Sequence, residues 1–125
     1  MIYSRLVNGK VRQGVAQIDI EAISSGSAQF CLWHQEFDAR VNYFGGYHPS
    51  FGTVFNSSVN TGRSNMTSQI NLLDAKTRKH TVLQQVDGIS QEELADTVCY
   101  GVSSNGALLL VSAVSHEHYW LVYPE

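Results

Sequence analysis

Charge of either sign is scarce in this sequence. Only 15% of the 125 residues are charged and the formal net charge is −3, whereas an average soluble protein carries about 25% charged residues. So few basic residues provide no cationic field to hold a phosphate backbone, and we expect no general nucleic-acid binding. Ser, Asn and Gln take the place of the missing charges, which predicts a surface that is polar rather than ionic.

Cysteine is scarce as well, and long apolar runs are missing. Cys31 and Cys99 are too few for a disulfide framework, so we expect both to be reduced and buried. No apolar run approaches the roughly 20 residues of a membrane span, and the first ten residues break too early to form the core of a signal peptide. The sequence therefore predicts a cytoplasmic protein with no membrane partner.

The motifs of common catalytic centres are missing too. There is no P-loop, no dinucleotide-binding glycine pattern and no Gly-x-Ser-x-Gly elbow. His116 and His118 could offer two nitrogens to zinc, but no further residues complete the three or four ligands that zinc needs. Cys31 and Cys99 lie in apolar patterns where a thiol behaves as a small hydrophobic group. We expect no metal and no cofactor, and a non-catalytic protein is favoured over an enzyme.

What the sequence does have is a concentration of apolar residues near its C-terminal end. Residues 107–114 are apolar on both alternating faces, and residues 119–123 follow after a short polar break. A strand that is apolar on both faces belongs in the middle of a sheet covered on each side. We expect this run to form the centre of the core.

Alternation of apolar and polar residues predicts antiparallel strands through most of the remaining chain. Asn8-Gly9 is suited to a type I′ turn, and the polar connection 74–79 has the length of a longer hairpin loop. The predicted strands before the C-terminal run cover residues 1–7, 10–22, 28–34, 37–43, 53–55, 66–73 and 80–86.

One helix is predicted, over residues 91–104. Ser90 and Glu93 form a capping box, and Ile89 and Leu94 stand at the positions of a hydrophobic staple. Apolar residues then recur at helical spacing up to Asn105-Gly106, which supplies a left-handed stop. We expect an amphipathic helix that packs on the sheet.

Together these patterns predict a single α+β domain over residues 1–125. Its expected architecture is a mostly antiparallel curved sheet, or a partly closed barrel, of about six to eight strands, with one amphipathic helix near the C-terminus. No internal repeat and no interdomain linker is present.

The leading functional hypothesis concerns region 45–65. Residues 45–52 contain three glycines, a proline and three residues with ring side chains, namely two aromatic residues and a histidine. This composition predicts a shaped loop rather than a strand or helix. Aromatic side chains on a loop held by proline lose little entropy on binding; they could equally tuck inward and close one end of the core. We expect a small protein-binding module of inhibitor or adaptor type. Its contact residues are Tyr47, His48, Phe51 and Arg63.

The alternative is a small-ligand-binding protein or enzyme with a pocket inside the curved sheet. His34, Glu36 and Asp38 are two residues apart on a predicted strand and would share a face, as acid/base chemistry requires. Any sheet face exposed to solvent presents the same alternation. The pocket walls would be Trp33, Tyr43, Phe55 and Trp120, with His34, Glu36 or His118 as the polar group.

A third hypothesis is self-association. Residues 119–123 would form an uncharged strand, and if that strand lies at a sheet edge it could pair with its own copy.

Overall fold

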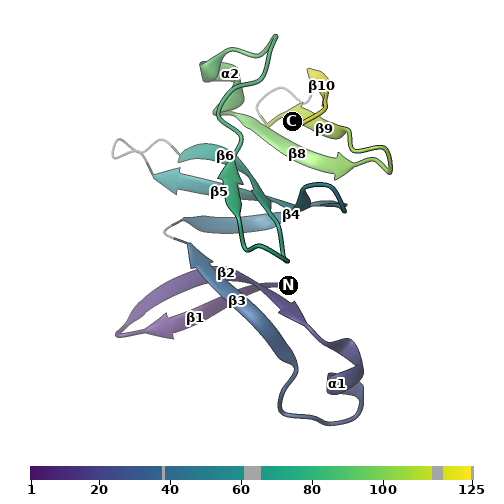
Figure 1. The fold of residues 1–125 in the computed structure, drawn as a ribbon. Helices are drawn as coiled ribbons and strands as arrows, with labels where there is room; N and C mark the ends of the chain where they lie inside the picture. Colours follow the sequence, from purple (N-terminus) through teal and green to yellow (C-terminus); the bar gives the residue numbers. More distant parts are fainter. Residues whose placement is uncertain (38, 61–65, 114–116, 125) are drawn as a thin grey trace. The chain divides into compact units, whose positions relative to one another are not determined.

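The structure is a computed structural model that describes residues 1–37, 39–60, 66–113 and 117–124. The chain divides into two compact units, Met1–Val41 and Asn42–Glu125, which are called unit 1 and unit 2 below. Within the described residues there are ten strands and two short helices (Figure 1).

Unit 1 is a three-stranded antiparallel sheet with one helix. The strand order is β1-β2-β3. Asn8 and Gly9 have positive φ angles of 50° and 78°, and Val7 pairs with Lys10 across them, so the predicted hairpin is confirmed. The elements of unit 1 are β1 (Ile2–Val7), β2 (Lys10–Ile18), α1 (Ile20–Ser24) and β3 (Cys31–Phe37).

The predicted end of the second strand is wrong, because helix α1 begins before it. The alternation of apolar and polar residues predicted a strand up to residue 22, but β2 ends at Ile18. Asp19 is the N-cap residue of α1, and its carboxylate accepts a hydrogen bond from the Ala22 amide at 3.2 Å. A side chain that satisfies the free amides of a first helical turn favours a helix start over continued pairing.

Unit 2 contains two antiparallel sheets, in the orders β4-β5-β6-β7 and β10-β9-β8. Strand β9 is the middle strand of its sheet, as its apolar character on both faces predicted. The elements are β4 (Arg40–His48, which begins in unit 1), β5 (Gly52–Asn60), β6 (Met66–Leu73), β7 (His80–Val82), α2 (Gln91–Leu94), β8 (Thr97–Val102), β9 (Leu108–Ser112) and β10 (Tyr119–Val122).

The predicted α+β class is therefore wrong. The described residues form a mostly β structure of three antiparallel sheets, without a closed barrel and without a long amphipathic helix near the C-terminus. The capping box of Ser90 and Glu93 is confirmed, but α2 ends at Leu94. The residues that follow form β8, which is rich in β-branched and aromatic side chains and pairs with β9. Three successive side chains of β8, from Thr97 to Cys99, are buried. Pairing on a buried sheet overrides the helical spacing.

The prediction of an irregular loop over residues 45–52 is also wrong, because β4 runs through Gly45 and Gly46 to His48. A Cβ atom on Gly45 would lie 2.8 Å from Cys99 Sγ. This glycine serves the close approach of β4 to β8, which is one of the uses of glycine within a strand. The turn itself is confined to residues 49–51.

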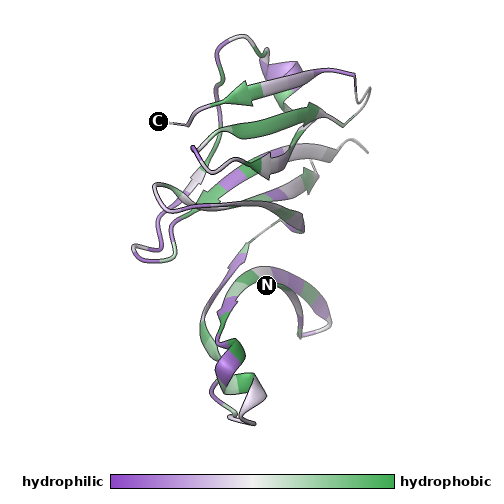
Figure 2. Cartoon of the chain, turned by 90° about the vertical axis from the view of Figure 1, so that its right-hand side faces the viewer, coloured by the Kyte–Doolittle hydropathy of each residue, from purple (hydrophilic) through white to green (hydrophobic). Residues whose placement is uncertain are grey.

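The two sheets of unit 2 share one hydrophobic core. Figure 2 shows hydrophobic stretches on strands of both sheets, and the buried cluster draws residues from β5, β6, β8 and β9. The cluster consists of Val54, Ile70, Leu72, Ile89, Leu94, Cys99, Leu108 and Leu110.

Asn56 links the two sheets through this core. Its side chain is buried, with 1% exposure. The amide Nδ2 donates to the Cys99 carbonyl at 2.9 Å, and Oδ1 accepts from the Cys99 backbone N–H at 2.9 Å. These bonds lie where the register of β8 shifts between Cys99 and Gly101. The asparagine thereby satisfies backbone groups of β8 that β9 does not pair.

A second buried amide organises the β5–β6–β7 side of the core. Asn71 Nδ2 donates to the Phe55 carbonyl at 3.2 Å and to Ser57 Oγ at 2.9 Å. Its Oδ1 accepts from Nε2 of His80 at 2.9 Å, and the His80 ring stacks on Phe55 with a centroid distance of 5.9 Å. Burial lowers the pKa of His80 below its ordinary value of 6.5, because the charged imidazolium would lose its hydration.

We predict that Asn56→Ala lowers the free energy of unfolding by about 2–4 kcal/mol, because the buried N–H and C=O of Cys99 lose their partner. Urea unfolding followed by circular dichroism measures the loss. The matched control is Asn42→Ala, since the amide of Asn42 bonds to Ser58 Oγ at an exposed position, and a surface change of this kind costs about 0.5 kcal/mol or less. Equal losses for the two variants would contradict the proposed role of Asn56.

We predict that His80 makes unit 2 less stable at acid pH. Its folded-state pKa lies below the unfolded value, so the unfolded chain takes up the proton first as pH falls below about 6.5. The free energy of unfolding therefore decreases from that pH down through the folded-state pKa. His80→Gln, which keeps a donor for Asn71, should remove this part of the pH dependence in urea titrations between pH 7.5 and 5. If the variant kept the wild-type dependence of the unfolding free energy on pH, groups other than His80 would be responsible for that dependence.

Candidate functional site

Strand β10 forms one edge of its sheet and presents two different faces. Tyr119 and Leu121 are 61% and 71% exposed, whereas Trp120 and Val122 are half-buried and pack against the core cluster. The strand is thus anchored by every second side chain and leaves the others on the surface.

An open groove of about 930 Å³ lies beside β10 and is called the β10 groove. Its walls come from the turn after β4, from β6, β7 and the segment that follows β7, and from residues 121–124. Three charged side chains, Asp74, Lys79 and Asp87, stand among its lining residues. Its apolar lining is made by Phe51, Leu72, Val82, Leu83, Val86, Leu121, Val122 and Pro124.

Of the residues predicted to contact a partner, Phe51 lines this groove. Tyr47 is 60% exposed near the end of β4. The His48 ring stacks on Phe51 with a centroid distance of 5.2 Å and an interplanar angle of 22°, and Phe51 lines the groove. Arg63 lies outside the described residues.

Hydrogen bonds fix the ring of His48. Nε2 lies 3.1 Å from the Ser104 carbonyl oxygen. That oxygen can only accept, so Nε2 carries the proton and Nδ1 is the acceptor. Nδ1 accepts from the Ser50 hydroxyl at 2.7 Å and from the Ser50 backbone N–H at 3.1 Å. A hydroxyl bonded to imidazole is one requirement of a serine nucleophile, but here both bonds close the turn from His48 to Phe51 and hold the stacked pair in place.

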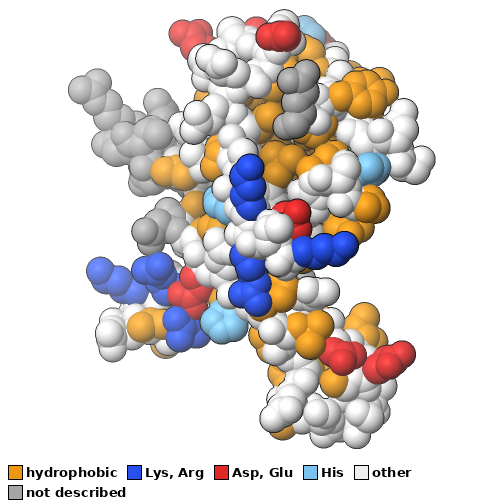
Figure 3. Space-filling view, in the orientation of Figure 1, with side chains coloured by type: hydrophobic (Ala, Val, Ile, Leu, Met, Phe, Trp, Pro, Cys, Tyr) orange, Lys and Arg blue, Asp and Glu red, His pale blue; other side chains and the backbone are white. Residues whose placement is uncertain are grey.

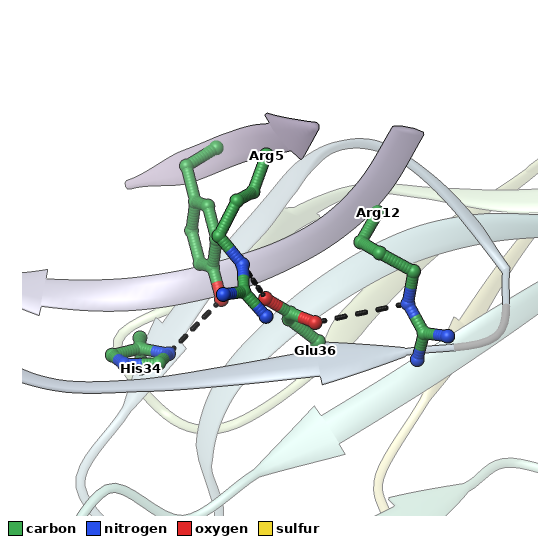
Figure 4. Close-up of polar contacts among 5 residues, drawn as sticks. Arg5, Arg12, His34 and Glu36 are labelled. Atoms are coloured by element: carbon green, nitrogen blue, oxygen red, sulfur yellow. Dashed lines mark hydrogen bonds and ion pairs between the residues drawn. The ribbon is translucent and has the colours of Figure 1, made fainter. Parts of the chain in front are cut away.

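A second polar cluster lies on the sheet of unit 1 (Figure 4). His34 and Glu36 share one face of β3, as predicted. Arg5 Nε on β1 is 2.5 Å from Glu36 Oε1, and Arg12 Nε on β2 is 3.7 Å from Glu36 Oε2. The hydroxyl of Tyr3 lies 3.1 Å from His34 Nδ1. In Figure 3 a red and a pale-blue side chain lie beside blue ones over this sheet.

The electrostatics of this cluster favour a structural ion pair. The hydrogen bond from Arg5 lowers the pKa of Glu36, and the charges of Arg5, Arg12 and His34 lower it further. A carboxylate held ionised between two guanidinium groups is a poor acceptor of protons. Burial, followed by the charge of Glu36, raises the pKa of Tyr3 and keeps its hydroxyl protonated. Asp38, the third residue of the predicted row, lies outside the described residues.

Gly14 allows the Tyr3 ring to reach His34. Tyr3 pairs with Gly14, and a Cβ atom there would lie 2.7 Å from the Tyr3 hydroxyl oxygen and would also collide with the backbone oxygen of Gln35. The Tyr3 ring therefore crosses the middle strand, β2, at Gly14, where no side chain blocks it. This pairing of a glycine with an aromatic residue on the next strand is a signal that the sequence pattern alone did not single out.

The aromatic residues of the predicted pocket have different environments. Phe55 is fully buried, and Tyr43 is 40% exposed. Trp33 belongs to unit 1, where its Nε1 donates to Gln17 Oε1 at 2.6 Å. Trp120 lies in unit 2 beside a shallow hollow of about 480 Å³, which is lined by Glu93, Glu117, His118, Tyr119 and Trp120.

Neither cysteine belongs to a metal-binding group within the described residues. Cys99 is buried on β8, and burial raises its pKa to about 11, so it stays a thiol. Cys31 is exposed, contrary to the expectation of burial. In this part of the chain no group of three His, Cys, Asp or Glu residues could hold a metal ion. His116 lies outside it.

Neither helix in the described ranges is long and apolar enough to cross a membrane. No family model, curated protein or solved structure matches this chain.

We predict that Gly14→Ala destabilises unit 1, because the added methyl group collides with the backbone of β3 and with the Tyr3 ring. Overpacking of this kind costs about 1–3 kcal/mol. The matched control is Gly101→Ala on β8, where a Cβ atom meets nothing within 4 Å and the φ angle suits any residue. Hydrogen exchange of the β1–β3 amides should accelerate in the first variant only. Unchanged protection in Gly14→Ala would contradict the close packing of Tyr3 on Gly14.

Proposed function

We propose that this chain is a non-catalytic protein-binding module of the inhibitor or adaptor type, and that the β10 groove and the exposed side chain of Tyr47 form its contact surface. The observation that carries the proposal is the groove itself. Its lining combines eight apolar residues with polar ones that include Asp74, Lys79 and Asp87, and residues of the edge strand β10 form one side.

The chemistry of the groove suits an apolar anchor side chain from a polypeptide. Protein contacts commonly combine an apolar centre, shielded from water on binding, with a polar rim. Leu121 and Tyr123 line the groove and are 71% and 61% exposed, so the groove opens to solvent along its β10 side. An open, elongated surface fits a partner chain better than an enclosed small molecule.

The aromatic part of the surface is already ordered. Stacking on His48 holds Phe51, and the hydrogen bonds to Ser50 and Ser104 hold His48. Side chains that are fixed before binding lose less conformational entropy in the complex. This support favours recognition by the turn that follows β4.

We further propose that the module works in the cytoplasm. Both Cys31 and Cys99 are free, and Cys31 is exposed. An exposed free thiol suits a reducing compartment.

The proposal predicts that Phe51→Ala and Tyr47→Ala weaken partner binding by roughly tenfold or more, as loss of an aromatic anchor does. Immobilised wild-type protein is incubated with cell extract, a retained protein is identified and purified, and its affinity for each variant is measured by calorimetry. Tyr47 is 60% exposed, so its replacement leaves the fold intact even if Phe51→Ala does not.

The matched control is Tyr100→Ala, which removes an exposed aromatic side chain from β8, outside the lining of the β10 groove. Its affinity for the purified partner should equal that of the wild type. A partner that binds Tyr47→Ala and Phe51→Ala as tightly as Tyr100→Ala would refute the proposed surface.

A further inference from the structure

The backbone of β10 shows which of its residues face the open edge. Ser112 N–H donates to the His118 carbonyl at 3.1 Å, and Trp120 pairs with Leu110 in the same ladder. In an antiparallel ladder every second residue turns both its N–H and its C=O toward the same neighbour. The backbone groups of His118, Trp120 and Val122 therefore face β9, and those of Tyr119 and Leu121 turn outward. Tyr123, the residue after the strand, would continue this alternation.

This edge, although short, has no charge, proline or bulge within it to prevent strand addition. Charged side chains, proline and bulges block most natural strand edges. Residues 119–123 contain no charge and no proline, and the pairing of β10 with β9 has no register shift.

Other sheet edges in the described ranges do carry such features. Arg5 lies on β1, Glu36 on β3 and Arg40 on β4, and β8 is bulged between Cys99 and Gly101. Strand β7 has only three residues. The contrast singles out β10 as the edge open to pairing.

The sequence of this edge is symmetric in the way that self-pairing requires. It reads Tyr-Trp-Leu-Val-Tyr over residues 119–123. A two-fold axis at Leu121 places Leu121 opposite Leu121 of the second copy, and Tyr119 opposite Tyr123 of the second copy. Tyr119 and Leu121 turn their backbone groups outward, and Tyr123 would do so if the strand continued by one residue in the dimer, so each opposed pair could exchange two hydrogen bonds.

We infer that two copies of this chain associate by antiparallel pairing of their β10 strands about this axis, which joins two three-stranded sheets into one. Tyr119, Leu121 and Tyr123 are 61%, 71% and 61% exposed and would form Tyr–Tyr and Leu–Leu pairs across the new ladder. Because residues 119–123 are uncharged, the pairing brings no two like charges together on this strand. The inference does not depend on the proposed partner-binding function.

The expected association is reversible. Pairing of two five-residue edges buries less than the roughly 1,200 Å² of a stable interface, so we expect a dissociation constant on the order of 0.1 mM. Light scattering of the full chain from about 0.02 to about 2 mM should show the mean mass rising from one chain toward two. A mass of one chain throughout this range would overturn the inference.

Leu121→Lys tests the position of the axis, because it sets two ammonium groups opposite each other. We expect it to raise the dissociation constant at least tenfold. The control is Tyr100→Lys, which introduces the same charge at an exposed aromatic position of β8 and should leave the dimer unchanged. If the two variants dimerise equally well, another surface is responsible.

Cysteine cross-linking tests the register in a Cys31→Ser background. Leu121→Cys should form a disulfide-linked dimer with itself, because opposed Cα atoms in such a pair lie about 5.5 Å apart. Tyr119→Cys should cross-link slowly alone and rapidly when mixed with Tyr123→Cys. Equal rates for Tyr119→Cys alone and Leu121→Cys would exclude the two-fold axis at Leu121.

Discussion

The pair of hydrogen bonds between the Asn56 side chain and the backbone of Cys99 is the constraint on which unit 2 depends. It joins β5 of one sheet to β8 of the other at 2.9 Å in both directions, within a core where neither group can reach water. Such bonds are directional, whereas hydrophobic packing is not. The apolar cluster supplies most of the driving force, and Asn56 specifies which part of β8 lies over β5.

The exposed features of unit 2 follow from this arrangement. With β8 fixed by Asn56 and β9 covered on both faces, β10 is left as the outer strand, anchored by Trp120 and Val122. The turn after β4 and the segment after β7 then provide the other walls of the groove beside it. The β10 groove and the open strand edge thus arise together, because a short apolar strand lies at the side of the core.

Local signals in the sequence predicted the structure well where the chain itself determines it. The Asn8-Gly9 hairpin, the Ser90–Glu93 capping box and the central position of β9 are confirmed. The helix over residues 91–104 and the loop over residues 45–52 are wrong because partners distant in the sequence decide both: β9 pairs with β8, and Cys99 requires a glycine at position 45. The groove and the Asn56 bonds depend on similar distant contacts, which periodicity does not report.

The scarcity of charge acquires a physical meaning in the structure. Arg5, Arg12 and Glu36 are used to link the three strands of unit 1, where side chains of opposite sign meet across neighbouring strands. Strand β10 has no such charge, and a single lysine on it would oppose pairing with a second copy. An uncharged edge that stays unpaired favours aggregation. Selective pairing of β10 with its own copy would cover this edge.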